Sequence, residues 1–194
     1  MRKLLVHEFT SLDGILQAPG GPDEDRDGGF AHGGWTRAYW DNAIGQTFGA
    51  LMQDVDAFLL GRKTYVTHAE AFEPMPAGDP FGDLMNTPAK YVVSRTLTKP
   101  LWRNTTIIKD DVIAAIRALK AKPGKTIVTD GSSQLVHALI EHDLVDDLYL
   151  HVFPLALGRG KRVFPEGSGA LKKFRLSTAT PYKTGVVGLH YTRA

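Results

Sequence analysis

The stretch Phe58–Tyr65, FLLGRKTY, decides the fold, because an apolar run stops at Gly61 and is followed at once by two cations and a threonine. Asp56–Leu60 is typical of a short buried strand, and Arg62–Phe72 is predicted to be a helix that ends before Pro74. Cations at a helix start oppose the helix dipole. Two interpretations stay open: a strand followed by a surface helix, or a junction that binds an anion, which would relieve this mismatch.

The same alternation of apolar strands and amphipathic helices continues along the chain. Further strands are predicted at Leu4–Thr10, Lys90–Val93, Thr105–Lys109, Lys125–Thr129 and Asp147–Phe153, and further helices at Trp35–Gln53, at Asp111–Ala121 and from Ser132 or Ser133 onward. Two loops rich in Pro and Gly cover 17–34 and 73–88, and 173–192 is predicted to form a hairpin around TPYKTG. This order predicts an α/β fold whose largely parallel sheet has helices on both faces and an antiparallel C-terminal edge. No linker divides the chain, so we expect residues 1–194 to form one domain.

The composition argues against several kinds of chemistry and partner. The chain has 194 residues, a net charge of +2 and no cysteine, so disulfides and thiolate chemistry are excluded. Its Lys and Arg residues are scattered, which argues against a nucleic-acid partner. No apolar run approaches the ~20 residues of a membrane span, and the N-terminus does not resemble a signal peptide, so we expect a cytoplasmic protein without a membrane partner. The seven histidines have no metal-ligand spacing, and no metal site is predicted.

Two other strand ends also carry side chains suited to phosphate. Ser94 and Arg95 directly follow the predicted strand that ends at Val93, and Gly131 leads into two serines at the start of a helix. Each junction has an ordinary alternative, namely a surface loop for the first and helix capping for the second. Because the carboxyl ends of parallel strands share one edge of a sheet, the three junctions together favour a dinucleotide ligand. The two arginines, Arg62 and Arg95, are then available for an extra phosphate on the ribose.

Candidates for the substrate side come from the N-terminal third of the chain. Asp13, in the turn SLDG, and Asp41, near the start of the second predicted helix, are the candidate proton donors. Asp13 is alternatively a turn aspartate that binds nearby amides, and Asp41 a helix N-cap. The remaining substrate-side candidates are Trp35, Tyr39, Trp40 and His151. The aromatic side chains could stack on a flat heterocycle, although core packing is the alternative.

Five motifs give the chain a family resemblance: SLDG at 11–14, LLGRKTY at 59–65, VVSRTL at 92–97, TDGSSQLVHAL at 129–139 and LVDDLYLHVFPLALGRGKRVF at 144–164. In this order they resemble the dihydrofolate reductase-like superfamily, and within it the reductase domain of the bifunctional riboflavin-biosynthesis deaminase/reductase. The resemblance implies a three-layer α/β/α fold and NADPH as the hydride donor. It also implies a homodimer that pairs through the C-terminal strands. The loop 17–34 corresponds to a mobile lid over the nicotinamide.

The resemblance also assigns roles to the three junctions. It implies that Gly61, Arg62, Lys63 and Thr64 contact the cofactor phosphates, that Ser94 and Arg95 contact the adenosine ribose phosphate, and that Gly131, Ser132 and Ser133 cover the pyrophosphate. Ser132 replaces the second of two glycines that are common in the family. The expected function is an NADPH-dependent reductase that acts on a pterin-like or ribosylaminopyrimidine-like heterocycle. The alternative is an NADP(H)-binding protein of the same fold without turnover.

Overall fold

The computed structural model describes residues 1–164, 167 and 171–194. In this part of the chain a sheet of eight strands has the order β4-β3-β2-β5-β1-β6-β8-β7. All neighbours from β4 to β6 pair in parallel, whereas β8 runs antiparallel to both β6 and β7. The strands are β1 Leu4–Ser11, β2 Val55–Gly61, β3 Ala89–Val93, β4 Thr105–Ile108, β5 Thr126–Asp130, β6 Asp147–Phe153, β7 Phe174–Pro181 and β8 Val187–Arg193.

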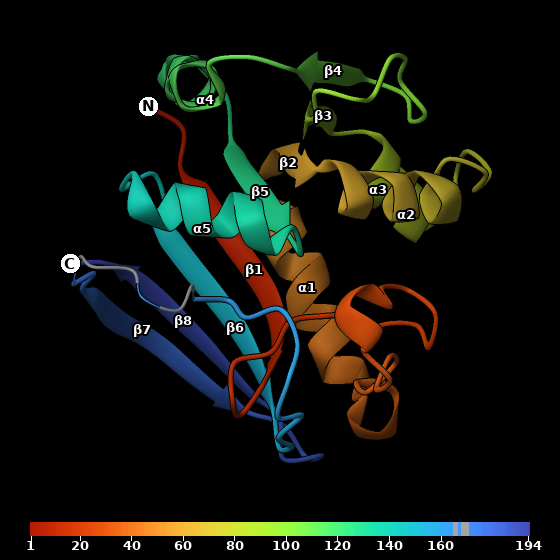
Figure 1. Ribbon diagram of the computed structural model, residues 1–194, viewed down its shortest axis with the longest axis vertical. Helices are drawn as coiled ribbons and strands as arrows, with labels where there is room; N and C mark the ends of the chain where they lie inside the picture. Colours follow the sequence, from red (N-terminus) through yellow and green to blue (C-terminus); the bar gives the residue numbers. More distant parts are fainter. Residues whose placement is uncertain (165–166, 168–170) are drawn as a thin grey trace.

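Helices cover both faces of the sheet, as Figure 1 shows. The helices are α1 Asn42–Met52, α2 Arg62–Phe72, α3 Pro80–Asn86, α4 Val112–Ala121 and α5 Ser133–Glu141. In β1, Leu4 and Val6 pack with residues of α4 and α5, while Leu5 packs with residues of α1, α2 and α3. Such alternation follows from the two-residue period of a strand. The predicted α/β class, with a mostly parallel sheet and an antiparallel C-terminal hairpin, is confirmed.

Two of the predicted elements are wrong in part, namely the start of one helix and the content of one loop. The helix predicted from Trp35 begins only at Asn42, and the segment before it forms turns with a short 3₁₀ helix, Arg37–Tyr39. Trp35 is instead buried and donates a hydrogen bond from its indole nitrogen to the carbonyl of Gln17 at 2.8 Å, which anchors the preceding loop. The predicted loop 73–88 contains α3, whose N-cap Asp79 accepts a hydrogen bond from the amide of Gly82.

The carboxyl ends of β2, β5 and β1 lie next to one another in the sheet. Since α2 and α5 begin directly after β2 and β5, their free N-terminal amides lie at the same edge. This arrangement is the usual location of ligand sites in open α/β sheets. Among the described residues, no helix is long and apolar enough to cross a membrane.

Candidate functional site

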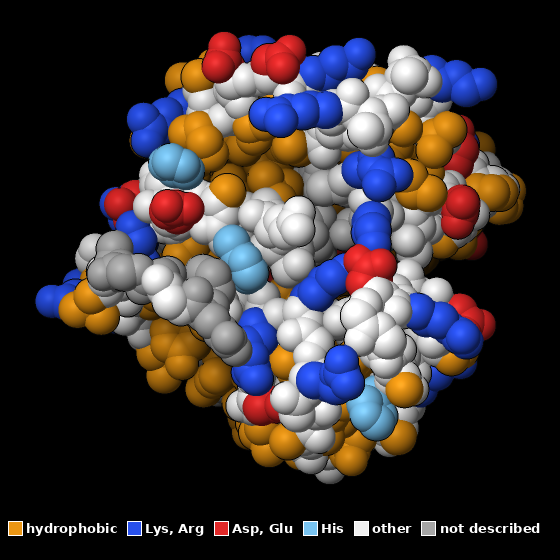
Figure 2. Space-filling model, in the orientation of Figure 1, with side chains coloured by type: hydrophobic (Ala, Val, Ile, Leu, Met, Phe, Trp, Pro, Cys, Tyr) orange, Lys and Arg blue, Asp and Glu red, His pale blue; other side chains and the backbone are white. Residues whose placement is uncertain are grey.

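A cavity of about 730 Å³ opens at this edge of the sheet. In the orientation of Figure 2 the face is hollowed between its upper and lower halves, with Lys and Arg side chains beside the hollow. The cavity wall includes every residue of the three predicted junctions: Gly61, Arg62, Lys63, Thr64, Ser94, Arg95, Gly131, Ser132 and Ser133. Further residues of the wall come from β1, from the loop 17–34 and from the helices α2, α4 and α5. The structure therefore brings the three sequence motifs to one site.

The first and third junctions are hydrogen-bonded to each other. The amide of Gly61 donates to Ser132 Oγ at 2.9 Å, and the amide of Ser132 donates to Thr64 Oγ1 at 3.0 Å. Gly131 and Ser132 both have left-handed backbones, with φ of +65° and +59°. A Cβ on Gly131 would lie 3.0 Å from Thr64 Oγ1, which is closer than a methyl group normally packs. The close backbone turn that paired glycines would allow is thus present, and Ser132 adopts it at a cost in strain.

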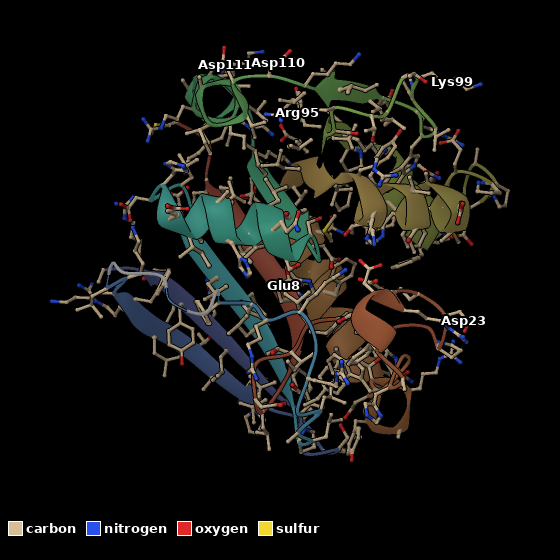
Figure 3. All side chains as sticks on the ribbon, viewed as in Figure 1. Glu8, Asp23, Arg95, Lys99, Asp110 and Asp111 are labelled. Carbon is tan, nitrogen blue, oxygen red and sulfur yellow. The ribbon has the colours of Figure 1, made fainter. Side chains whose placement is uncertain are left out.

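The second junction supplies charge rather than a hydroxyl group. Ser94 is buried, and its Oγ accepts hydrogen bonds from the amides of Thr96 and Leu97 at 3.2 and 2.9 Å, so it stabilises its own turn. Arg95 and Arg62 are exposed, and neither forms an ion pair with any residue that the structure describes. In Figure 3 Arg95 lies beside α4, at the end of the cleft away from Glu8. Two arginines are therefore available to an anionic ligand.

Lys63 is already paired with a carboxylate from the loop 17–34. Its ammonium group contacts Asp27, which also accepts a hydrogen bond from Lys161 at 2.8 Å. Lys161 contacts Asp25 as well. Hydrogen bonds from Lys161 and Lys63 lower the pKa of Asp27 to about 2, so this carboxylate is ionised at neutral pH. These ion pairs hold the predicted lid against α2, and they occupy a lysine that we expected to contact phosphate.

Asp13 holds a turn together and does not line the cavity. Its carboxylate accepts hydrogen bonds from the Ser11 hydroxyl at 2.6 Å and from the amides of Leu157 and Gly158 at 3.0 and 2.8 Å. Partial burial raises its pKa, but the three hydrogen bonds outweigh that effect and lower the pKa to about 2. The group is a carboxylate at neutral pH, which favours the turn alternative over proton donation.

Asp41 also has a local structural role. It is the N-cap of α1, and its side chain accepts a hydrogen bond from the amide of Ala43 at 2.9 Å. Of the three aromatic candidates, Trp35 is buried in the core and Tyr39 packs beside that core. Trp40 is 46% exposed and meets Phe9, a residue of the cavity wall, edge to face at 5.9 Å. The geometry therefore leaves Trp40 as the aromatic candidate adjacent to the cavity.

His151 is fully buried and is not part of the cavity wall. Its Nδ1 is 3.2 Å from His7 Nε2, and its Nε2 is 3.3 Å from the hydroxyl of Tyr182. Burial, with the nearby His7, lowers the pKa of His151 to about 3, so the ring is neutral at physiological pH. This placement favours a core role over the predicted contact with substrate.

Among the titratable residues of the cavity wall, sequence reasoning did not name Glu8, His68 and Asp130 as candidates. Asp130 Oδ2 lies 3.9 Å from His68 Nε2 and 4.0 Å from His7 Nδ1. Burial opposes ionisation of Asp130, but the hydrogen bond and electrostatic interaction with His68 prevail, and its pKa is lowered. Glu8 could have been found, because it is the single carboxylate in the apolar run of β1 and lies on the same face of the strand as Leu4 and Val6.

Fold and cleft together define a class: three-layer α/β proteins with a nucleotide-sized cavity at the carboxyl edge of a mostly parallel sheet. A family model described as the RibD C-terminal domain matches residues 2–188, and the chain belongs to this family. It is 25% identical over 197 residues to the uncharacterized protein YyaP of Bacillus subtilis, covering 98% of this chain and 94% of YyaP. It is 28% identical over 193 residues to the uncharacterized protein YwjB of the same organism, covering 100% of this chain and 99% of YwjB.

Solved structures with the same fold include two kinds of reductase. A pyrimidine reductase-like protein from Corynebacterium diphtheriae matches with a TM-score of 0.69 at 13% identity, covering 100% of this chain and 92% of that one. A second match, with a TM-score of 0.67 at 12% identity, is the diaminohydroxyphosphoribosylaminopyrimidine deaminase/5-amino-6-(5-phosphoribosylamino)uracil reductase of Thermotoga maritima. It covers 100% of this chain and 57% of that one. Dihydrofolate reductase from Enterococcus faecalis, complexed with NADP(H), matches with a TM-score of 0.62 at 15% identity, covering 98% of this chain and 96% of that one. The predicted dihydrofolate reductase-like fold is confirmed.

Proposed function

We propose that this protein is an NADPH-dependent reductase of the riboflavin-pathway and dihydrofolate reductase type. The observation that carries the proposal is that all three phosphate-suited junctions lie on the wall of one cavity. Membership of the RibD C-terminal domain family supports the same reaction class. The dihydrofolate reductase of similar fold is described as a complex with NADP(H), which supports the choice of cofactor.

The residues present fit a phosphorylated dinucleotide. The left-handed turn at Gly131 and Ser132 leaves room for a ligand to approach the backbone, and the amides at the start of α5 can bind a pyrophosphate. Arg62 and Arg95 offer planar, bidentate donors to a phosphate on the adenosine ribose. When bound, NADPH supplies a hydride; the protein positions the reactants and excludes water. Phosphate near Lys63 would compete with Asp27, which would couple cofactor binding to the loop 17–34.

The proposed substrate is a small planar heterocycle, pterin-like or ribosylaminopyrimidine-like. Phe9 on the cavity wall and Trp40 beside it provide aromatic surface on which a flat ring can stack. The Thermotoga maritima relative of similar fold is described as a reductase of a ribosylated aminouracil, which supports the second class.

A second candidate function is an NADP(H)-binding protein without turnover. The observation in its favour is that Asp13 and Asp41, the two predicted proton donors, both accept hydrogen bonds from backbone amides. Strong NADPH binding without oxidation across a panel of pterin, ribosylaminopyrimidine and quinonoid compounds would favour this candidate.

The cofactor assignment is tested by titrating NADPH and NADH into the wild type, the double variant Arg62→Ala/Arg95→Ala and the control Arg117→Ala. Arg117 is exposed on α4 and does not line the cavity. We expect the wild type and control to prefer NADPH and the double variant to lose this preference, since one charged contact contributes ~1.5–3 kcal/mol. An unchanged preference in the double variant would exclude the role given to these arginines, and a wild type that binds neither nucleotide would refute the proposed function.

We further propose that two copies pair through the C-terminal strands. β7 is the edge strand of the sheet and is exposed along most of its length, with Leu176 at 51%. An uncovered edge strand is a natural site for strand pairing. Light scattering after gel filtration should give twice the chain mass for the wild type, and Leu176→Arg should reduce it. A monomeric wild type would contradict the proposal.

A further inference from the structure

Glu8 is a buried carboxyl group on the wall of the cavity. It is 2% exposed, and its Oε2 accepts a hydrogen bond from the amide of Gly131 at 3.1 Å. Its Oε1 is buried and has no hydrogen-bond partner among the described residues. Figure 3 places Glu8 in the middle of the cleft, between α5 and the loop 17–34. An unpartnered buried oxygen is costly, so its persistence in a ligand cavity points to a contact with the ligand.

The surroundings of Glu8 favour its neutral form. Burial, followed by the nearby negative charge of Asp130, raises the pKa of Glu8 well above its ordinary value, and the hydrogen bond from Gly131 only partly opposes this. The pKa of Asp130 is lowered, so two carboxyl groups at one site are driven to opposite protonation states. Such a pair is the usual arrangement of an acid beside a carboxylate. His7 of β1 also faces the site. The other titratable groups on the cavity wall are Glu24, Asp25, Asp27, Arg62, Lys63, His68, Arg95, His142 and Lys161.

We propose that Glu8 is the catalytic acid of this reductase and gives its proton to the heteroatom of a C=N or C=O bond in the substrate. The proposal rests on the proposed function, whose nicotinamide dinucleotide is the reductant. In the step, the Glu8 O–H bond breaks and a new N–H or O–H bond forms on the substrate. The substrate carbon accepts the hydride, so that two electrons and two hydrogens are added in total. Glu8 is left as a carboxylate and is reprotonated from solvent.

The substrate class follows from this chemistry. A proton donor is needed where hydride addition leaves charge on nitrogen or oxygen, as in an imine, a carbonyl or a ring C=N bond. Glu8 meets the need better than Asp13 or Asp41, because it lies on the cavity wall and has a free oxygen, whereas the other two are engaged by local amides. If the oxidised, positively charged form of the cofactor binds in this cavity, its charge would favour the carboxylate form of Glu8 over the neutral acid.

The protonation state can be measured without substrate. Carbon-13 NMR of protein labelled at the glutamate carboxyl carbons, with the Glu8 signal assigned by its loss in Glu8→Gln, should show a protonated carboxyl group at neutral pH. The amide of Gln keeps an oxygen for the Gly131 hydrogen bond, so the variant is expected to fold. A Glu8 signal at the position of a carboxylate at neutral pH would overturn the proposal.

Calorimetry in buffers of different ionisation enthalpy then counts the protons released on cofactor binding. We expect NADP⁺ to release more protons from the wild type than from Glu8→Gln, and NADPH to release equal numbers from both. Glu70→Gln, which alters an exposed carboxylate of α2 that does not line the cavity, should behave as the wild type. Equal release by the wild type and Glu8→Gln on NADP⁺ binding would overturn the catalytic role. Failure of both nucleotides to bind would instead refute the proposed function, and the role of Glu8 with it.

Discussion

Replacing Ser132 by alanine and by glycine should separate the strain in its backbone from the hydrogen bond of its side chain. Ser132 has a left-handed φ of +59°, and its Oγ accepts a hydrogen bond from the amide of Gly61 at 2.9 Å. Alanine loses the hydrogen bond and keeps the strain. Glycine loses both, because it has no Cβ to clash in a left-handed backbone.

The magnitudes follow from these two contributions. A left-handed non-glycine residue costs ~1–2 kcal/mol, and a typical hydrogen bond contributes ~0.5–1.5 kcal/mol. Ser132→Ala should therefore lower the free energy of unfolding by ~0.5–1.5 kcal/mol, and Ser132→Gly should be more stable than Ser132→Ala by ~1–2 kcal/mol. For a chain of this length that difference corresponds to ~2–8 °C in melting temperature.

Urea denaturation followed by circular dichroism gives the free energies of unfolding. The control is Ala118→Gly, the same exchange of alanine for glycine at an exposed position of α4 with ordinary helical backbone. There glycine should be the less stable residue by ~0.8–1 kcal/mol. If Ser132→Gly is no more stable than Ser132→Ala, the turn is not strained as described.

The remaining predictions concern charged groups. Asp13→Asn should destabilise the protein at neutral pH. Because the Asp13 pKa is lowered from 3.8 to about 2, its contribution is lost as pH falls through that range, so acid titration of the urea midpoint should bring the variant and wild type together. Burial lowers the pKa of Lys90 from 10.5 to about 8, so between pH 8 and 10.5 the unfolded chain binds more protons than the folded one. The wild type should therefore gain stability relative to Lys90→Met as the pH rises through this range, and parallel pH profiles of the two proteins would contradict this. Asp27→Asn removes the carboxylate that joins Lys63 to Lys161, and hydrogen exchange should accelerate in 17–34 but not in β7 or β8.

The order and layering of the elements could be predicted because most of the strands, unlike the exposed β7, are short apolar runs closed by a turn signal. The start of α1 could not, since the apolar spacing from Trp35 onward is compatible with helix, and only the contact between Trp35 and Gln17 shows that the segment belongs to the loop. α3 was hidden by its proline and glycine content, although Asp79 and Pro80 form a regular cap and first turn.

The meeting of the three junctions in one cavity could be predicted, because they consist of backbone amides and cations next to recognisable strand ends. Glu8, the proposed acid, could not be predicted, because a proton donor is defined by its surroundings. Asp13 and Asp41 have the right chemistry, but local amides bind them. Glu8 gains its properties from burial beside Asp130, a residue 122 positions away that meets it only in the folded sheet.

The hydrogen bonds between Gly61, Thr64 and Ser132 have a consequence for how this sequence can drift. Each of the two serine and threonine hydroxyl groups satisfies an amide that the other loop leaves free, although the partners are about seventy positions apart. Loss of either hydroxyl group leaves a backbone amide of the facing loop without this partner. The amide at position 132 is present whatever side chain stands there, so among relatives of this chain position 64 should keep a hydroxyl group even where 132 is glycine. The hydroxyl group at 132 serves only the amide of Gly61, so position 132 should vary more freely than position 64.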